Sequence, residues 1–239
     1  MAESLADKRV LVIGRPSGIA GAVVQASCAA GAHVIVAGRD PRKLELAYAG
    51  TGVRVDAVDL TSDDSIAALA GRLDRVDHVV STASARARGS LEQLERDDVR
   101  LSFDTKVIGP LMLAKHLRSK INPVGGSLVL FSGVAAFQIH AGTLAVAITN
   151  GAADTLTRSL AVEMAPVRVN AISPGTIDTG AWDALGERGK ADYYAHVAAS
   201  NPVRRIGTPR EVAQAVLFCM ENTFLTGQTL KVDGGQQLA

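Results

Sequence analysis

The feature that most constrains the fold is a regular alternation of short apolar runs with longer stretches of helical periodicity. Several runs are continuously apolar, which indicates strands buried on both faces, as in a parallel sheet covered by helices. Strands are expected at Arg9–Ile13, His33–Ala37, Arg54–Val58, His78–Ser81, Ser127–Phe131, Arg168–Ile172 and Thr229–Val232. Helices are expected near Gly18–Ala30, Ser62–Arg72, Leu91–Ile121, Thr143–Ala165 and Pro209–Phe218.

This order predicts an α/β fold, a Rossmann-type doubly wound parallel sheet of about seven strands with helices on both faces. One domain is expected over residues 1–239. The segment Thr208–Glu211 predicts a helix start, since a Thr cap is followed by Pro and, three residues after the cap, Glu. Thr176–Asn201 lacks clear periodicity, so we expect a long loop there that acts as a substrate lid. Trp182 and two tyrosines within it would fit a partly apolar substrate.

Composition argues against several classes of function. The formal net charge is +1 and no basic stripe stands out, so nucleic-acid binding has no electrostatic basis. No apolar run is long enough to span a bilayer, and Met1–Arg9 lacks the apolar stretch of a signal peptide. We therefore expect a cytoplasmic protein with no membrane partner. Cys28 and Cys219 are expected to be buried, reduced thiols, and no metal site is expected.

A glycine-containing turn follows the first expected strand. Gly14 allows the tight turn, and Gly18 lets the backbone approach a pyrophosphate, whose charge the helix N-terminus favours. The third glycine of the common dinucleotide pattern is Ala20 here, so a plain strand–helix turn stays open as an alternative.

The end of the second strand indicates which dinucleotide is bound. An NAD site places a carboxylate there for the ribose 2′-hydroxyl, whereas this chain has Gly38 followed by Arg39. Arg39 can pair with a 2′-phosphate, and Arg15 lies in the neighbouring loop. We therefore predict NADP(H) rather than NAD(H). Two alternatives remain: both arginines are solvated, or Asp40 reaches the ribose.

Further motifs follow in collinear order. Asp59-Leu60 comes after the third strand, Ser81–Ser84 ends the fourth, Arg168–Gly175 ends in a Pro-Gly turn, and Val232–Gly235 lies near the C-terminus. With these motifs the chain resembles the short-chain dehydrogenase/reductases over essentially its whole length. In that family the corresponding segments contact adenine, carry Asn-Asn-Ala-Gly, lie beside the nicotinamide and form a C-terminal signature.

The resemblance implies a small-molecule substrate and a homo-oligomer, tetramer or dimer. The coenzyme-binding residues it implies are Gly14, Arg15, Ser17, Gly18, Ile19, Arg39, Asp59, Leu60, Thr82, Ala83, Ser84, Asn150, Pro174, Gly175, Ile177 and Thr179.

The family's catalytic positions carry other residues here. The family uses an Asn, a Ser and a Tyr-x-x-x-Lys helix, in which the Tyr exchanges a proton with the substrate oxygen and the Lys lowers its pKa. Alignment by flanking residues places Lys106 at the Asn position, Gly133 at the Ser position, Val146 at the Tyr position and Asn150 at the Lys position. Val146 cannot donate a proton and Asn150 carries no charge, so the family's usual mechanism is excluded on this alignment.

The exchanged positions of Lys and Asn suggest remodelling. The two helices pack side by side in the family, so Lys106 would keep an ammonium near the ribose and the substrate oxygen, and Asn150 would bind the ribose hydroxyls. Ser132, one residue before the Ser position, is a further catalytic candidate. The alternatives are that Ser132 has a structural role and that Lys106 reaches the surface or pairs with Asp104 or a neighbouring subunit.

Three functions are compatible with these patterns. The first is an NADP(H)-dependent oxidoreductase that acts on a carbonyl, alcohol or enone with a non-standard proton donor. The second is a catalytically inactive NADP(H)-binding sensor or partner subunit. The third is a protein whose pocket takes another ligand.

Overall fold

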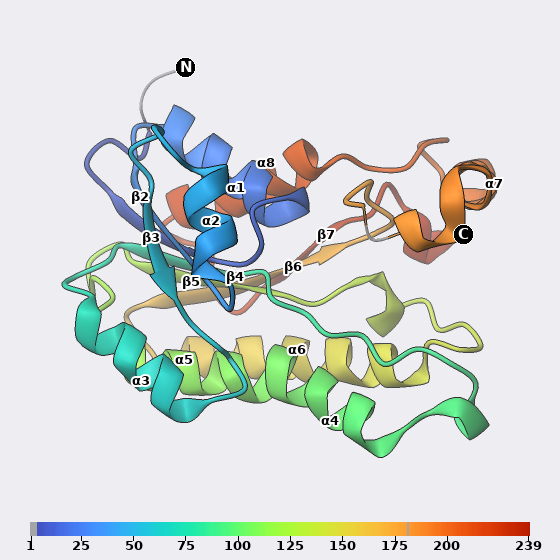
Figure 1. Ribbon diagram of the computed structural model, residues 1–239, viewed down its shortest axis with the longest axis horizontal. Coiled ribbons are helices and arrows are strands. Elements are labelled where there is room, and N and C mark those ends of the chain that lie inside the picture. The colour runs from blue at the N-terminus through green and yellow to red at the C-terminus, as the bar shows by residue number, and fades with distance from the viewer. Residues whose placement is uncertain (1–3, 181) are drawn as a thin grey trace.

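A seven-stranded parallel sheet forms the centre of the computed structural model, which describes residues 4–180 and 182–239 (Figure 1). The strands are β1 Arg9–Ile13, β2 His33–Gly38, β3 Arg54–Ala57, β4 His78–Ser81, β5 Ser127–Phe131, β6 Arg168–Pro174 and β7 Thr229–Val232. They lie in the order β3-β2-β1-β4-β5-β6-β7, with every neighbouring pair parallel. All seven expected strands are therefore confirmed, and their bounds differ from the expected ones by two residues at most.

Helices cover both faces of the sheet, as the doubly wound prediction requires (Figure 1). The helices are α1 Gly18–Ala29, α2 Pro41–Ala47, α3 Asp63–Arg72, α4 Arg96–Phe103, α5 Gly109–Leu117, α6 Leu144–Glu163, α7 Gly186–Ser200 and α8 Pro209–Glu221. One apolar core joins the sheet to α1, α2 and α8, and the other joins it to α3, α5 and α6. Among the described residues, no helix is both long and apolar enough to cross a membrane.

The strand order reverses between β1 and β4. The chain runs outward from β1 to β2 and β3, then returns to place β4 on the other side of β1. The loops that leave the carboxyl ends of β1 and β4 therefore diverge and open a crevice, which is where ligands bind in open α/β sheets.

The expected helix over Leu91–Ile121 is wrong as a continuous helix. A short 3₁₀ turn at Leu91–Gln93 precedes α4, and a π-helical segment at Asp104–Ile108 joins α4 to α5. Pro110 lies just inside α5, has no N–H to donate to the carbonyl four residues earlier, and would clash with it. The carbonyl four residues before Pro110 belongs to Lys106. The π-helical segment, which is wider than an α-helical turn, therefore includes Lys106.

The expectation of a loop over Thr176–Asn201 is also wrong, because most of this stretch forms the 3₁₀ turn Asp183–Leu185 and α7. Only Val197 is buried along α7, so the helix has no apolar stripe that a sequence pattern could reveal. Residue 181 of the predicted lid and residues 1–3 of the N-terminal stretch lie outside the described residues.

Three local expectations can be compared directly with the structure. The capping box at Thr208 and Glu211 is confirmed. Cys219 is buried as expected, but Cys28 is exposed, so that expectation was wrong. Cys28 lies near the end of α1, one residue after the buried Ser27.

Arg168 fixes the far end of α8 from the start of β6. Its guanidinium is buried and donates to the carbonyl oxygens of Cys219, Met220 and Asn222 at 2.6–2.8 Å, and also to those of Leu225 and Gly125. A single cation thereby satisfies helix-terminal carbonyls that have no partner within the helix.

Candidate functional site

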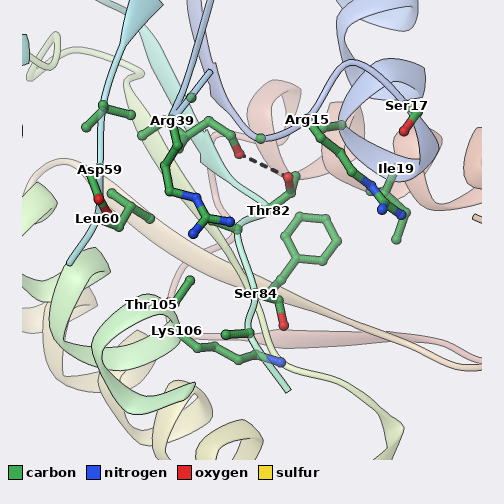
Figure 2. A pocket seen from close by; sticks show the side chains of 18 of the residues that line it. Arg15, Ser17, Ile19, Arg39, Asp59, Leu60, Thr82, Ser84, Thr105 and Lys106 are labelled. Atoms are coloured by element: carbon green, nitrogen blue, oxygen red, sulfur yellow. Dashed lines mark hydrogen bonds between the residues drawn. The ribbon is translucent and has the colours of Figure 1, made fainter. Parts of the chain in front are cut away.

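A cavity of about 920 Å³ opens at the carboxyl ends of β1 and β4, at the point where the strand order reverses (Figure 2). Its walls come from the turn after β1, the ends of β2 and β3, the segment after β4, the π-helical segment, and the ends of β5 and β6. A volume of this size is typical of cofactor and ligand sites.

The turn after β1 requires glycine because neighbouring segments approach its backbone. A Cβ added at Gly14 would lie 2.3 Å from Oγ1 of Thr82 and 2.6 Å from Cβ of Ala20. Thr82 fixes the same turn from β4 by donating to the carbonyl oxygen of Ile13 at 3.0 Å. Gly18 has a φ of +61° and would meet Thr179. Side chains from α1, from the residues after β4 and from the segment after β6 therefore pack directly against the backbone of this turn.

The first turn of α1 is suited to an anion. Ser17 is the N-cap residue, but its side chain makes no capping hydrogen bond, and no acidic residue lies in the first turn. The N–H groups at this helix end thus keep their capacity to bind a phosphate, and the turn from Gly14 to Ser17 lines the cavity beside them. These features fit the pyrophosphate of a dinucleotide.

The second strand ends in a glycine for a steric reason. A Cβ added at Gly38 would lie 3.0 Å from the carbonyl oxygen of Gly14. Arg39 follows and extends into the cavity (Figure 2). Among the described residues, its guanidinium has no hydrogen bond or ion pair, whereas the neighbouring Asp40 caps α2 and pairs with Lys43 at 3.3 Å. Asp40 is therefore engaged with its own helix, and Arg39 is free to bind an anionic group.

Lys106, Ser132 and Asn150 form one buried hydrogen-bonded cluster. The Lys106 ammonium donates to the carbonyl oxygen of Ser132 at 2.9 Å and to Oδ1 of Asn150. The Ser132 hydroxyl donates to the carbonyl oxygen of Asn150 at 3.1 Å. Only 8% of the Lys106 surface is exposed, and it is not paired with Asp104 among the described residues, so both structural alternatives for Lys106 are wrong within this chain.

The surroundings of Lys106 change its acid–base behaviour. The pKa of the Lys106 ammonium is lowered to about 7, first by burial and then by the positive charge of Arg86, while the negative charge of Asp154 opposes both effects. A group with a pKa close to neutral can both give and accept a proton at physiological pH.

The Asn150 side chain occupies the space next to residue 133. A Cβ added at Gly133 would lie 2.8 Å from Nδ2 of Asn150, which donates to the carbonyl oxygen of Gly133 at 3.3 Å. Val146 lies one helical turn before Asn150 and is buried. Among the described residues, no tyrosine lines the cavity.

Most of the predicted site residues lie together. The cavity is lined by Gly14, Arg15, Ser17, Ile19, Arg39, Asp59, Leu60, Thr82, Ala83, Ser84, Lys106, Ser132, Pro174 and Thr179. Gly18, Asn150, Gly175 and Ile177 do not line it. Asn150 lies behind Lys106, Gly175 packs against Asp233, and Ile177 lines a small cavity next to Gly207.

Several lining residues were missed from the sequence. They are Ile13, Pro16, Lys43, Leu44, Val58, Thr61, Ala85, Arg86, Leu101, Thr105 and Phe131. Some of them could have been found from position, because Ala85 and Arg86 directly follow the segment that ends β4. Leu101 lies in α4 and Thr105 in the π-helical segment, where one continuous helix had been predicted.

The reversed strand order, the glycine turn and the uncapped helix start beside a long cavity define a dinucleotide-binding protein of the doubly wound α/β class. The family model described as enoyl-(acyl carrier protein) reductase matches residues 13–237. The chain is 31% identical to the short-chain dehydrogenase/reductase ATR9 of Stachybotrys chlorohalonatus, over 95% of each chain. It is also 31% identical to carbonyl reductase family member 4 of Xenopus tropicalis, over 95% of this chain and 97% of that one.

A solved structure of a small-chain dehydrogenase in complex with NADPH superposes with a TM-score of 0.87 at 29% identity and covers 98% of this chain and 100% of the other. The chain belongs to the short-chain dehydrogenase/reductase family, a family of oxidoreductases that use a nicotinamide coenzyme.

Proposed function

We propose that the protein is an NADP(H)-dependent oxidoreductase that interconverts a carbonyl or enone with its reduced form, and that Lys106 exchanges the proton. The observation that carries the proposal is the Lys106 ammonium, which is buried at the wall of the cavity and held by two acceptors. The NADPH complex of a structural relative and the carbonyl reductase among the sequence relatives support the coenzyme and the reaction class.

The chain's own residues divide into two groups in this proposal. Gly14, Ser17 and the start of α1 would hold the pyrophosphate, and Arg39 would hold the 2′-phosphate that distinguishes NADP(H) from NAD(H). When bound, the coenzyme supplies or accepts the hydride, which is chemistry that no side chain provides.

The Lys106 ammonium can donate a hydrogen bond to the carbonyl oxygen of a substrate. An ammonium has three N–H donors, and the carbonyl of Ser132 and the side chain of Asn150 use two of them. The third is available to a carbonyl oxygen in the cavity, where the positive charge would stabilise the oxyanion and the N–H would supply its proton. In the reverse direction, the neutral amine would accept the proton of an alcohol.

Asn150 and Ser132 act on Lys106 and are positioning residues in this proposal. The side chain of Asn150 accepts a hydrogen bond from the Lys106 ammonium and donates one to the carbonyl oxygen of Gly133. The Ser132 hydroxyl donates a hydrogen bond to the carbonyl oxygen of Asn150. The two residues therefore fix the direction of the remaining N–H.

The test is consumption of NADPH over a panel of ketones, quinones and enones with the wild type, Lys106→Met and the exposed control Lys115→Met. We expect Lys106→Met to lower kcat roughly 10²–10⁴-fold, the usual contribution of a positioned general acid, with little change in NADPH affinity. Lys115→Met should match the wild type. Unchanged turnover in Lys106→Met would remove Lys106 from the chemistry, and NADPH binding without turnover of any substrate would favour an inactive sensor.

A further inference from the structure

Charges are distributed unevenly along the cavity. The two acidic residues among its lining residues are Asp40 and Asp59, which follow β2 and β3 at the end predicted to hold adenosine. Both are engaged locally, Asp40 with Lys43 and Asp59 with the N–H and hydroxyl of Thr61. At the opposite end, Arg86 and Lys106 line the wall and, within residues 4–180 and 182–239, no carboxylate lines it.

Arg86 is a cation without a counterion. Among the described residues it makes no ion pair, and no hydrogen bond of its side chain is present. It is solvent-exposed at the cavity wall, yet its pKa is lowered by desolvation and then by the positive charges of Arg88 and Arg15. Its own charge in turn lowers the pKa of Lys106. This part of the cavity therefore holds several positive charges whose repulsion an anion would relieve.

The neighbouring arginine is tied to the predicted lid. The Arg88 guanidinium lies 4.5 Å from the centre of the Trp182 ring, and the Trp182 and Tyr193 ring centres are 4.3 Å apart. The Arg88 guanidinium is thereby engaged in a cation–π contact. Its positive charge still adds to the local potential, and the guanidinium of Arg86, two residues earlier, has no such contact among the described residues. The contact joins the segment after β4 to α7.

From this arrangement we propose that the substrate carries a carboxylate, which Arg86 binds while the reacting carbonyl oxygen faces Lys106. The planar guanidinium offers paired donors that match a carboxylate, and no carboxylate among the described residues that line this part of the cavity competes for them. The inference rests on the proposed function and adds the substrate class, a keto or enone acid. A neutral carbonyl compound would leave Arg86 without a partner.

The test compares acid and amide forms of the same compound, using small 2-oxo and 3-oxo acids and their amides. Binding to the NADPH-loaded protein is measured by quenching of coenzyme fluorescence, which does not require turnover. The proteins are the wild type, Arg86→Met, Arg86→Lys and Arg210→Met, an exposed arginine at the start of α8 that does not line the cavity. Thermal unfolding of each variant checks that it is folded.

In the wild type we expect the acids to bind at least about tenfold more tightly than their amides, since a charge-assisted pair contributes about 1.5–3 kcal/mol. Arg86→Met should abolish this preference, Arg86→Lys should keep part of it, and Arg210→Met should keep all of it. The NADPH affinity should be the same in all four proteins.

Two results would overturn the inference. One is an equal affinity of wild-type protein for acids and amides, which includes the case in which neither binds. The other is a loss of NADPH affinity in Arg86→Met, which would assign Arg86 to the coenzyme phosphates. Turnover of neutral ketones with no preference for acids would refute the substrate class and leave the oxidoreductase proposal intact. Arg86-dependent binding of acids without any turnover would support the substrate class and refute the oxidoreductase proposal.

Discussion

Replacement of Asp154 by Asn should move the pH profile of carbonyl reduction toward lower pH. Reduction needs the ammonium form of Lys106, whose pKa is lowered from 10.5 to about 7. This difference corresponds to about 5 kcal/mol against the charged form. One pH unit above the pKa only about a tenth of the molecules carry the ammonium, so the rate of reduction should fall about tenfold per unit above pH 7.

Asp154 opposes this decrease because its negative charge raises the pKa of Lys106. Asp154→Asn removes the charge and keeps an acceptor for the Thr229 hydroxyl, which lies 2.8 Å from Oδ1. The pKa of Lys106 should then fall further, and the decline in reduction should begin at lower pH. Oxidation needs the neutral amine, so its rising limb should move to lower pH as well.

Arg86→Met supplies the opposite perturbation, since the positive charge of Arg86 lowers the pKa of Lys106. Its profile should move to higher pH. The assay is kcat against pH at saturating substrate and NADPH in both variants and the wild type. A wild-type profile without a limb near pH 7 would refute the reasoning, and so would displacement of both variants in the same direction, because structural damage does not distinguish the sign of the removed charge.

Three further predictions concern the coenzyme and the stability of the fold. Arg39→Met should weaken NADPH binding roughly 10- to 150-fold and leave NADH binding unchanged, since a charge-assisted contact contributes about 1.5–3 kcal/mol; fluorescence titration of both coenzymes, with Arg210→Met as control, tests this. Burial lowers the pKa of His78 from 6.5 to about 4, so the unfolded chain binds the extra proton between these values, and the free energy of unfolding should fall by about 3 kcal/mol as the pH drops from 6.5 to 4. Urea denaturation should show this slope in the wild type and lose it in His78→Gln, and equal slopes would exclude His78 as the cause. Arg168→Met should lower the free energy of unfolding by about 3–5 kcal/mol, because several buried carbonyl oxygens lose their donor, whereas the exposed Arg158→Met should change it little.

The sheet could be predicted because its strands are marked in the sequence. Continuous runs such as Arg9–Ile13 and Ser127–Phe131 are buried along almost their whole length, so hydrophobicity alone locates them. Helices α2 and α7 gave no such signal, since only Leu44 is buried in the first and only Val197 in the second. Helix patterns can be read when an apolar stripe faces the core, and these two helices have none.

The residues of the candidate site also divide into those that could be predicted from the sequence and those that could not. The glycine turn was identified because Gly14 and Gly18 form a short pattern directly after β1, although the side chains that require them, Thr82 and Thr179, come from distant segments. Lys106 was identified from flanking residues, and it lines the cavity. Asn150, which was expected to bind the ribose hydroxyls, instead holds the Lys106 ammonium and does not line the cavity. Arg86 was missed because its importance depends on the other residues that line its part of the cavity, none of which is a carboxylate among those described, and these residues come from segments far apart in the chain.

The fit between Gly133 and Asn150 has a consequence for how such a site can change. A side chain at residue 133 collides with Asn150, and a second ammonium at residue 150 would be placed against that of Lys106. A side chain at residue 133 therefore requires Asn150 to move or to be replaced, and an ammonium at residue 150 requires a change at Lys106. In evolutionary terms the three positions are epistatic, since the effect of a substitution at one of them depends on the residues at the other two.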